Sequence, residues 1–264
     1  MADGERVIQS RTMTTVRHLN CGTLHAPPNP AVGCHCLLLE DAAGLALIDT
    51  GIGLKDIADP VGRIGAAAIA AAGFQFRWAD TAVRQLERLG HDPAAVRHVV
   101  LTHADHDHVG GLADFPAATV HLSAEEHADI IAGHLRFSAA QFSHGPKWQP
   151  CSADATVDWF GLPARPLPLG FASDVLLVPL FGHTHGHCGV AVRQADRWLL
   201  HVGDAYYLRV ELTTDDHPVW ALSAAMALDD AARRASLAHL RRLHRDHAGE
   251  VAMVGYHDRD EFPG

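Results

Sequence analysis

The chain has 264 residues, of which 48% are hydrophobic, and it carries a formal net charge of −10. These values predict a globular protein and argue against a nucleic-acid partner, because phosphate binding requires clustered Lys and Arg side chains. They also argue against a membrane partner, since no stretch reaches the roughly 18 apolar residues of a spanning helix and the Ala-rich segment 65–74 is too short.

The N-terminal segment and the cysteines bear on location. Residues 1–20 contain no apolar region of the kind found in signal peptides, so we predict a cytoplasmic protein. The five cysteines are an odd number without a regular framework, which favours reduced thiols. Cys34 and Cys36 lie in an apolar, strand-like run and are expected to be small core residues.

The first part of the chain predicts strands and then a helix. Two apolar runs within 34–53 are joined by a turn, which predicts a hairpin that ends at Asp49. A helix is predicted over 78–90, because apolar residues recur with helical spacing and Gly90 stands where a helix would end. A short β-branched strand follows at 96–102.

The rest of the chain alternates strands with helices. Helices are predicted over 124–135 and, as one long element, over 223–247. Residues 136–165 form an irregular stretch that is long for a connector, which suggests a binding-loop insertion. Strands in two blocks, with helices between and after them, predict an α/β sandwich of two sheets in a single domain, 1–264. The remaining strands are predicted at 118–123, 174–180, 196–205 and 250–255.

Histidine and aspartate gather where predicted strands end, which is where rigid scaffolds present functional groups. One histidine after a strand means little, but four such sites in one chain, one of them dense, indicate bound metal. These sites are His103–His108, His183–His187, Asp204 and His257.

The dense cluster reads His-Ala-Asp-His-Asp-His from His103 to His108. Residues two apart in an extended segment point the same way, so His103 and Asp105 can face one ion. Asp107 and His108 lie at the following turn and can face a second ion. We therefore favour Asp105 over His106 as a ligand, and Gly110-Gly111 would let the backbone turn tightly.

These motifs resemble the metallo-β-lactamase superfamily. The resemblance is carried, in the family's order, by Asp49-Thr50-Gly51, by the cluster, and by Gly182–His187, Gly203–Tyr207 and Tyr256–Asp258. It implies an αββα sandwich of two mixed β-sheets flanked by helices, with a two-metal site at one edge of the sheets.

The resemblance also implies the ligands. His103, the residue at 105 and His183 would hold the first metal, Asp107, His108 and His257 the second, and Asp204 would bridge them. The family's cluster usually has His where this chain has Asp105. That change favours iron or manganese more than usual, although two zinc ions remain the first expectation.

Residues around the ligands have simpler expected roles. Asp49 resembles a carboxylate that orients a metal-binding His. His185 and His187 are expected behind the ligands or at the surface, and His201 in the core. His217 is expected in an exposed loop, with the site entrance as the alternative, and Cys188 in packing.

Two divalent ions that share Asp204 would also share a water and supply hydroxide near neutral pH, so we expect a hydrolase. Asp107, Asp204 and Tyr207 are the predicted catalytic residues. Tyr207 stands three residues after Asp204, as in the quorum-quenching N-acylhomoserine lactonases of the superfamily, where this Tyr contacts the substrate carbonyl; the alternative is a packing aromatic. Ser123 and Ser223 are expected to cap helices and not to act as nucleophiles.

The substrate is expected to be a small molecule, most simply a lactone or carboxylic ester. The alternatives are a phosphodiesterase of the same fold and a non-hydrolytic di-iron redox or metal-binding protein. The oligomeric state stays open, with a homodimer among the options. Five aromatic residues could form a wall for an acyl chain or the core of their own loop: Phe137, Phe142, Trp148, Trp159 and Phe160.

Overall fold

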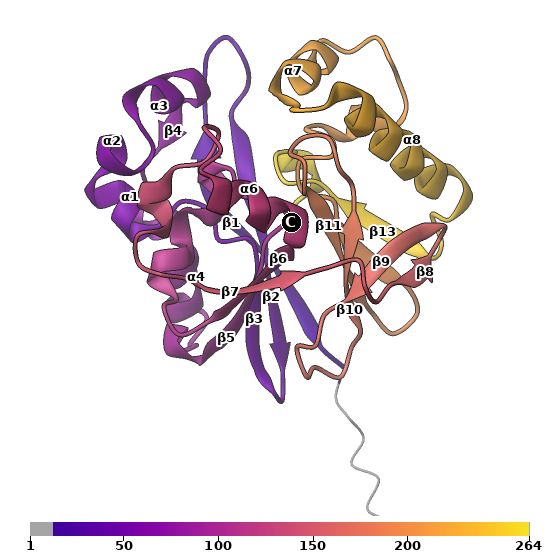
Figure 1. Ribbon diagram of the computed structural model, residues 1–264, viewed down its shortest axis with the longest axis horizontal. Coiled ribbons are helices and arrows are strands. Elements are labelled where there is room, and N and C mark those ends of the chain that lie inside the picture. Colours follow the sequence, from indigo (N-terminus) through magenta and orange to yellow (C-terminus); the bar gives the residue numbers. More distant parts are fainter. Residues whose placement is uncertain (1–12, 264) are drawn as a thin grey trace, which may run out of the picture.

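Two β-sheets pack face to face, and helices cover their outer faces (Figure 1). This computed structural model describes residues 13–263, so most of the segment searched for a signal peptide, 1–12, lies outside the described residues. The αββα sandwich of two mixed sheets is confirmed. Among the described helices, none has the length and apolar character needed to cross a bilayer.

The first sheet has seven strands in the order β4-β1-β2-β3-β5-β6-β7. β2 and β3 form the predicted hairpin, and β3, β5, β6 and β7 run parallel. The strands are β1 (Thr15–Leu24), β2 (Val32–Asp41), β3 (Gly44–Ile48), β4 (Phe74–Gln75), β5 (Val96–Val100), β6 (Thr119–Ser123) and β7 (Lys147–Cys151). The helices of this half are α1 (Leu54–Ala58), α2 (Pro60–Arg63), α3 (Ala66–Ala72), α4 (Ala82–Arg88), α5 (His106–Val109) and α6 (Ala124–Ala132).

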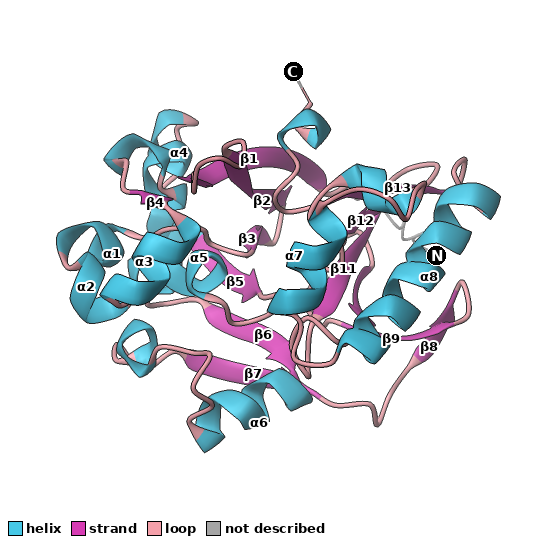
Figure 2. Ribbon diagram, turned by 90° about the horizontal axis from the view of Figure 1, so that it is seen from above, coloured by secondary structure: helices cyan, strands magenta, loops and turns pink. Residues whose placement is uncertain are grey.

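The second sheet has six strands in the order β13-β12-β11-β10-β9-β8, of which β12 and β13 are parallel. Its strands are β8 (Val157–Trp159), β9 (Leu162–Pro166), β10 (Val175–Pro179), β11 (Cys188–Arg193), β12 (Trp198–His201) and β13 (Val251–Val254). Two helices, α7 (Val219–Met226) and α8 (Asp230–Asp246), lie on this side of the molecule (Figure 2). Short 3-10 segments occupy Trp78–Asp80, Pro93–Ala95, Gly110–Asp114, Ala139–Phe142, Arg209–Leu212 and Arg259–Glu261.

The apolar run of β2 is continuous because both faces of its sheet are covered. Leu37 and Leu39 pack between the two sheets, in the same cluster as Leu177. Cys36 and Leu38 alternate with them and pack on the outer side. Cys34 and Cys36 are buried, as predicted.

Three helix predictions need correction. The predicted helix 78–90 is reduced to α4, because Trp78–Asp80 forms a separate 3-10 turn and Thr81 is extended. The segment 223–247 is not one helix, because α7 ends at Met226 and α8 begins at Asp230, where the Asp229 carboxylate accepts a hydrogen bond from the amide of Ala232. Ser223 therefore lies inside α7, whereas Ser123 caps α6 as predicted. The predicted helix 124–135 ends at Ala132, because Gly133 takes a left-handed conformation with φ of 72°.

The stretch 136–165 was expected to be irregular, but much of it forms regular structure. It contains the 3-10 segment Ala139–Phe142, β7, β8 and most of β9. β7 and β8 are short edge strands, one at the end of each sheet. Edge strands tolerate proline, as Pro150 in β7 shows, whereas Pro163 lies in β9 between β8 and β10. Both prolines masked the strand pattern in the sequence.

Candidate metal centre

The strands that carry the candidate ligands end at the same place. β10, β12 and β13 run in one direction because β11, between β10 and β12, is antiparallel to both. His183, Asp204 and His257 follow these three strands. β3 and β5 are parallel neighbours in the other sheet, and they end just before Asp49 and the dense cluster. Loops from both sheets therefore meet at one edge of the sandwich.

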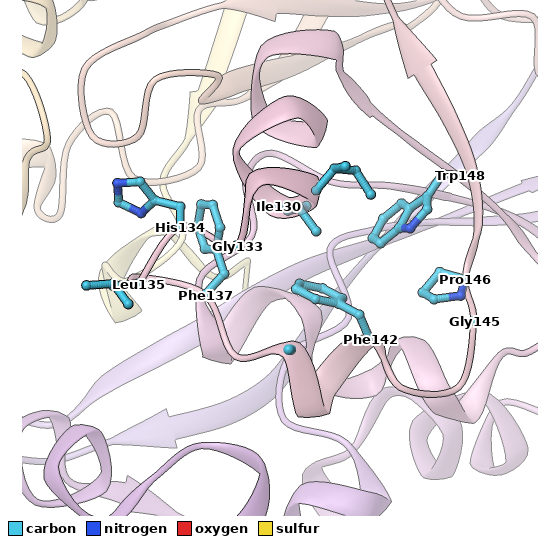
Figure 3. A pocket seen from close by; sticks show the side chains of 11 residues that line it. Ile130, Gly133, His134, Leu135, Phe137, Phe142, Gly145, Pro146 and Trp148 are labelled. Atoms are coloured by element: carbon cyan, nitrogen blue, oxygen red, sulfur yellow. The ribbon is translucent and has the colours of Figure 1, made fainter.

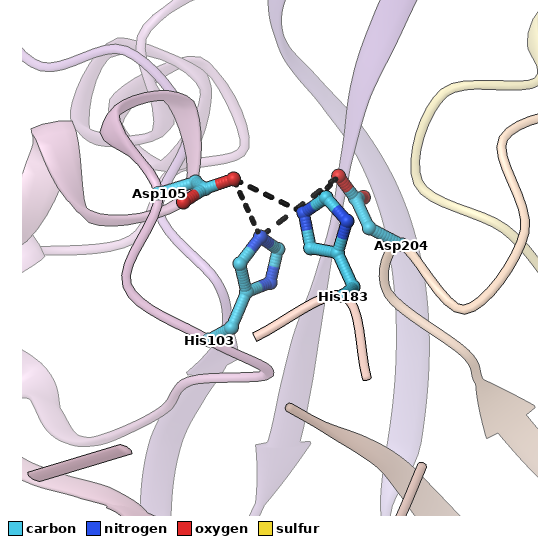
Figure 4. Close-up of side chains that lie close together, drawn as sticks. All are labelled: His103, Asp105, His183 and Asp204. Carbon is cyan, nitrogen blue, oxygen red and sulfur yellow. Dashed lines mark hydrogen bonds and ion pairs between the residues drawn. The ribbon is translucent and has the colours of Figure 1, made fainter. Parts of the chain in front are cut away.

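The first group of possible ligands is His103, Asp105, His183 and Asp204 (Figure 4). The Asp105 Oδ2 atom lies 3.1 Å from His183 Nε2 and 3.4 Å from His103 Nε2. The Asp204 Oδ2 atom lies 3.4 Å from His183 Nε2 and 3.8 Å from His103 Nε2. Two carboxylate oxygens and two imidazole nitrogens thus face one another.

The second group is Asp107, His108 and His257. Asp107 Oδ2 lies 3.8 Å from His257 Nε2 and 4.0 Å from His108 Nε2. Asp204 reaches this group as well, because its Oδ1 atom lies 3.4 Å from His108 Nε2 and its Oδ2 atom 3.3 Å from His257 Nε2. The Asp204 carboxylate therefore lies between the two groups.

The chemistry of these residues fits bound cations. Three buried atoms that face the cluster have no hydrogen-bond partner among the described residues: His103 Nε2, His108 Nε2 and Asp204 Oδ1. Unpartnered buried polar atoms are costly unless they bind something. Two ligand atoms on one tetrahedral cation, each about 2.0–2.1 Å from it, lie about 3.3 Å apart, and the spacings here are close to that value.

Hydrogen bonds orient the imidazoles so that Nε2 faces the cluster. Asp49 accepts one from His108 Nδ1 at 2.9 Å and another from the Thr102 hydroxyl at 2.8 Å. That hydroxyl lies 3.1 Å from His103 Nδ1, so Asp49 orients both histidines. His257 Nδ1 lies 2.9 Å from the Gly33 carbonyl oxygen. Such contacts fix the tautomer of metal-binding histidines.

The buried charges depend on one another. Burial alone would lower the pKa of His108, but Asp204, Asp49 and Asp107 hold it well above the ordinary value. Burial would likewise raise the pKa of Asp204, but His257 and His108 hold it well below the ordinary value. The carboxylate charge of Asp204 is therefore available to a cation.

Asp105, as predicted, faces the first group, and His106 turns away from it. His106 Nδ1 lies 3.1 Å from Gln141 Oε1. The expected reason for the two following glycines was wrong, because Gly110 has an ordinary helical φ of −55°. A Cβ atom on Gly110 would lie 2.7 Å from the Gly51 carbonyl oxygen, so close backbone approach is what requires glycine.

The other predicted histidines are not in the two groups. His187 Nε2 accepts a hydrogen bond from the Asp204 amide at 2.9 Å, so it supports the Asp204 loop from behind. His185 is exposed and pairs with Asp129. His201 is buried against the backbone of His35, as expected for a core residue. His217 is half-buried and lines a small pocket that Asp258 also lines, and Cys188 is a buried packing residue.

Tyr207 lies beside both groups. Its ring centroid is 5.8 Å from that of His183 and 5.2 Å from that of His257, with edge-to-face geometry in both cases. Burial, Asp204 and Asp105 raise its pKa well above the ordinary value. The phenol therefore keeps its proton and can donate a hydrogen bond.

The five aromatic residues of the loop separate into two sets. Phe137, Phe142 and Trp148 line a pocket of about 550 Å³ together with Ile130 (Figure 3). Trp159 and Phe160 instead belong to the core of the second sheet. Trp159 and Phe160 therefore belong to the core of the second sheet and not to a core of the loop itself, and an acyl-chain wall stays a prediction for the other three.

Sequence reasoning missed two charged residues at the site. Arg136 contacts Asp105 with two nitrogens and lies 2.8 Å from His183 Nε2. Glu126 is buried and accepts hydrogen bonds from the amides of Ala104 and Gly186 and from the Thr184 hydroxyl. Glu126 thereby joins the His103 loop to the His183 loop. The sequence held one hint of Arg136: Asp105 is negatively charged where the family usually has a neutral His, so a positive partner could be expected.

Replacing Glu126 with Ala should destabilise the protein by at least about 3 kcal/mol, because three buried donors lose their acceptor at about 1–3 kcal/mol each. Burial raises the pKa of Glu126 from 4.5 to about 7 despite these hydrogen bonds. The wild type binds this proton more tightly when folded, so its stability relative to Glu126→Gln should fall as pH rises from about 4.5 to about 7. Urea unfolding at several pH values would measure both effects.

The control for Glu126 is Asp129→Ala, on the same helix, whose carboxylate pairs with the exposed His185. That change should cost less than about 1 kcal/mol. If the two alanine variants lose the same free energy of unfolding, Glu126 does not hold the two loops together.

Comparison with known proteins identifies the family of the chain. The family model described as the metallo-beta-lactamase superfamily matches residues 29–253. A probable metallo-hydrolase of Mycobacterium tuberculosis is 42% identical over 256 residues, which cover 94% of this chain and 81% of that protein. An N-acyl homoserine lactonase of Azorhizobium caulinodans is 29% identical, over 86% of this chain and 82% of that protein.

Solved structures show the same fold. An N-acyl homoserine lactone hydrolase with N-hexanoyl-L-homoserine at its catalytic metal centre superposes with a TM-score of 0.70. The match covers 95% of each chain at 17% sequence identity.

Proposed function

This chain belongs to the metallo-β-lactamase superfamily and is a metal-dependent hydrolase, and from this premise we propose that it opens lactones or related carboxylic esters with two divalent cations. The observation that carries the two-cation proposal is the position of Asp204. Its two oxygens face two groups of imidazoles, and three atoms of this arrangement have no hydrogen-bond partner among the described residues.

The proposed ligands are His103, Asp105 and His183 for one cation, Asp107, His108 and His257 for the other, and Asp204 for both. When bound, such a pair supplies hydroxide near neutral pH and polarises the substrate oxygen. Four imidazoles favour zinc, and the oxygen of Asp105 leaves iron or manganese as alternatives. Metal analysis of protein purified without chelator should give about two cations per chain.

The residues of the chain have separate proposed tasks. Tyr207 keeps its proton and lies beside both groups, so it can donate a hydrogen bond to the carbonyl oxygen as negative charge develops there. Opening a lactone leaves an alkoxide oxygen that needs a proton. Asp107 is proposed to carry a proton from the attacking hydroxide to this alkoxide, because its carboxylate lies within the second group, near His257 and His108.

The lactone proposal rests on this placement of Tyr207 and on the lactonases among the relatives. It is tested with the metal-loaded protein and three panels: N-acyl homoserine lactones with acyl chains of increasing length, aryl esters, and phosphodiesters. Turnover of lactones well above the other classes is expected. Phosphodiester turnover without lactone turnover would replace the proposal by a phosphodiesterase, and oxygen uptake without hydrolysis would replace it by a redox protein.

A further inference from the structure

Arg136 directs its guanidinium group into the first group of candidate ligands. Its Nε atom donates to Asp105 Oδ1 at 2.5 Å, and one terminal nitrogen donates to Asp105 Oδ2 at 2.6 Å. This is the bidentate geometry that a planar guanidinium forms with a carboxylate and that an ammonium cannot form. The side chains of Arg136 and Asp105 are only 14% and 16% exposed, so water screens the pair weakly.

The two oxygens of Asp105 have different surroundings. Oδ2 faces His183 and His103 and also accepts from the terminal nitrogen of Arg136 that lies 2.8 Å from His183 Nε2, whereas Oδ1 accepts from Arg136 Nε. The other terminal nitrogen of Arg136 donates to the Met226 carbonyl oxygen at the end of α7, at 2.6 Å. Arg136 is thus fixed on both sides, and its fork holds Asp105 with Oδ2 turned toward the imidazoles.

The charges of the site explain why Asp105 needs this partner. Asp105, Asp107 and Asp204 face the cluster and Asp49 lies behind it, which makes four carboxylates. Their four negative charges would balance the four positive charges of two divalent cations. A hydroxide would then add one negative charge that nothing balances. A neutral His at position 105 would leave no such surplus. Arg136 brings one positive charge to the carboxylate that creates the difference.

We propose that Arg136 is a positioning residue for the first cation, and that Asp105 and Arg136 work only as a pair: the guanidinium aims Asp105 Oδ2 at the cation and neutralises the extra carboxylate. The inference rests on the two cations of the proposed function but not on its substrate. It also assigns the charge of Arg136 to Asp105, so Arg136 does not by itself indicate an anionic substrate.

The test compares the wild type with Arg136→Met, Asp105→His and the double variant Asp105→His/Arg136→Met. The measurements are cations bound per chain and the dissociation constant of each cation, by competition with a chromophoric chelator, for zinc and for manganese. Arg136→Met should raise the dissociation constant of one cation by about 10- to 100-fold, the range for residues that orient metal ligands. Asp105→His should raise the same dissociation constant by a similar factor, because an unpaired guanidinium would then face the cation.

The double variant should bind zinc within a few-fold of the wild type, because the imidazole needs no partner and the surplus positive charge is gone. This recovery is a coupling between the two positions and not a sum of two losses. It should be weaker for manganese, which prefers oxygen ligands. Arg136→Lys keeps the charge without the fork and should fall between the wild type and Arg136→Met.

Arg165→Met is the matched control, since Arg165 also pairs through two nitrogens with a carboxylate, that of Glu125. It should leave both dissociation constants unchanged. If Arg136→Met does not fold by circular dichroism, Arg136→Lys and the double variant still decide the matter.

Wild-type cation affinity in Arg136→Met, or a double variant no better than either single variant, would overturn the pairing. A wild-type chain that binds fewer than two cations would overturn the pairing and the proposed function together. Coupled cation affinities in a protein that hydrolyses no lactone would support the pairing and overturn only the substrate.

Discussion

Replacing Asp204 with Ala is expected to lower kcat/KM by at least about 1,000-fold, which corresponds to about 4 kcal/mol of transition-state stabilisation. Asp204 is the only one of the seven proposed ligands whose oxygens approach imidazoles of both groups among the described residues. Its removal takes a ligand from each cation and leaves the imidazoles without a carboxylate between them. The purified variant should contain about one cation per chain or fewer.

The matched control is Asp215→Ala, because Asp215 is a largely exposed carboxylate that pairs with Arg241 at the surface. This variant should keep its cations and its activity. Asp204→Asn should be nearly as inactive as Asp204→Ala, since an amide has no charge to share between two cations. Full activity in either Asp204 variant would refute the bridging role.

The seven proposed ligands could be found from the sequence because each follows an apolar strand closely. Parallel strands of one sheet end at the same edge, so the loops that follow them meet there. The spacing within each loop then indicates which side chains face the site. The choice of Asp105 over His106 also depended on local geometry alone. Asp105 precedes α5 in an extended conformation, with φ of −65° and ψ of 155°, so the alternation from His103 holds there.

The supporting contacts could not be found in this way, because they join distant parts of the chain. Arg136 meets Asp105 from 31 residues away, and Glu126 joins Ala104 to Thr184, which is 58 residues beyond it. Neither residue carries a local pattern that distinguishes it from an ordinary surface charge. Their roles follow only from how α6 and the loop after it pack beside the metal loops.

The long loop shows a second limit of sequence reasoning. Its aromatic residues look alike in sequence, but Trp159 packs into the second sheet while Phe137 and Trp148 line the pocket beside α6. Which sheet receives each residue is decided by pairing of the short strands β7 and β8. The β6–β7 pairing is non-local and the β8–β9 pairing is a short hairpin, and Pro150 in β7 and Pro163 in β9 leave no clear strand period.

The phenol of Tyr207 should matter for the reaction and little for binding. Tyr207→Phe is expected to lower kcat for a lactone by about 10- to 1,000-fold, the upper part of this range being the cost of a lost oxyanion donor. KM should change much less, because a bond to the carbonyl oxygen strengthens only as negative charge develops in the transition state. Steady-state kinetics on an N-acyl homoserine lactone would separate the two constants.

The neighbouring Tyr206 provides the control for Tyr207. Tyr206 is fully buried, but its hydroxyl bonds to the Glu261 carboxylate and not to the candidate site. Tyr206→Phe should therefore lower stability and leave kcat near the wild-type value. Both variants must retain two cations for the comparison to concern the phenol. If Tyr207→Phe then keeps the wild-type kcat, Tyr207 is a packing residue between His183 and His257, and the oxyanion must find its donor elsewhere.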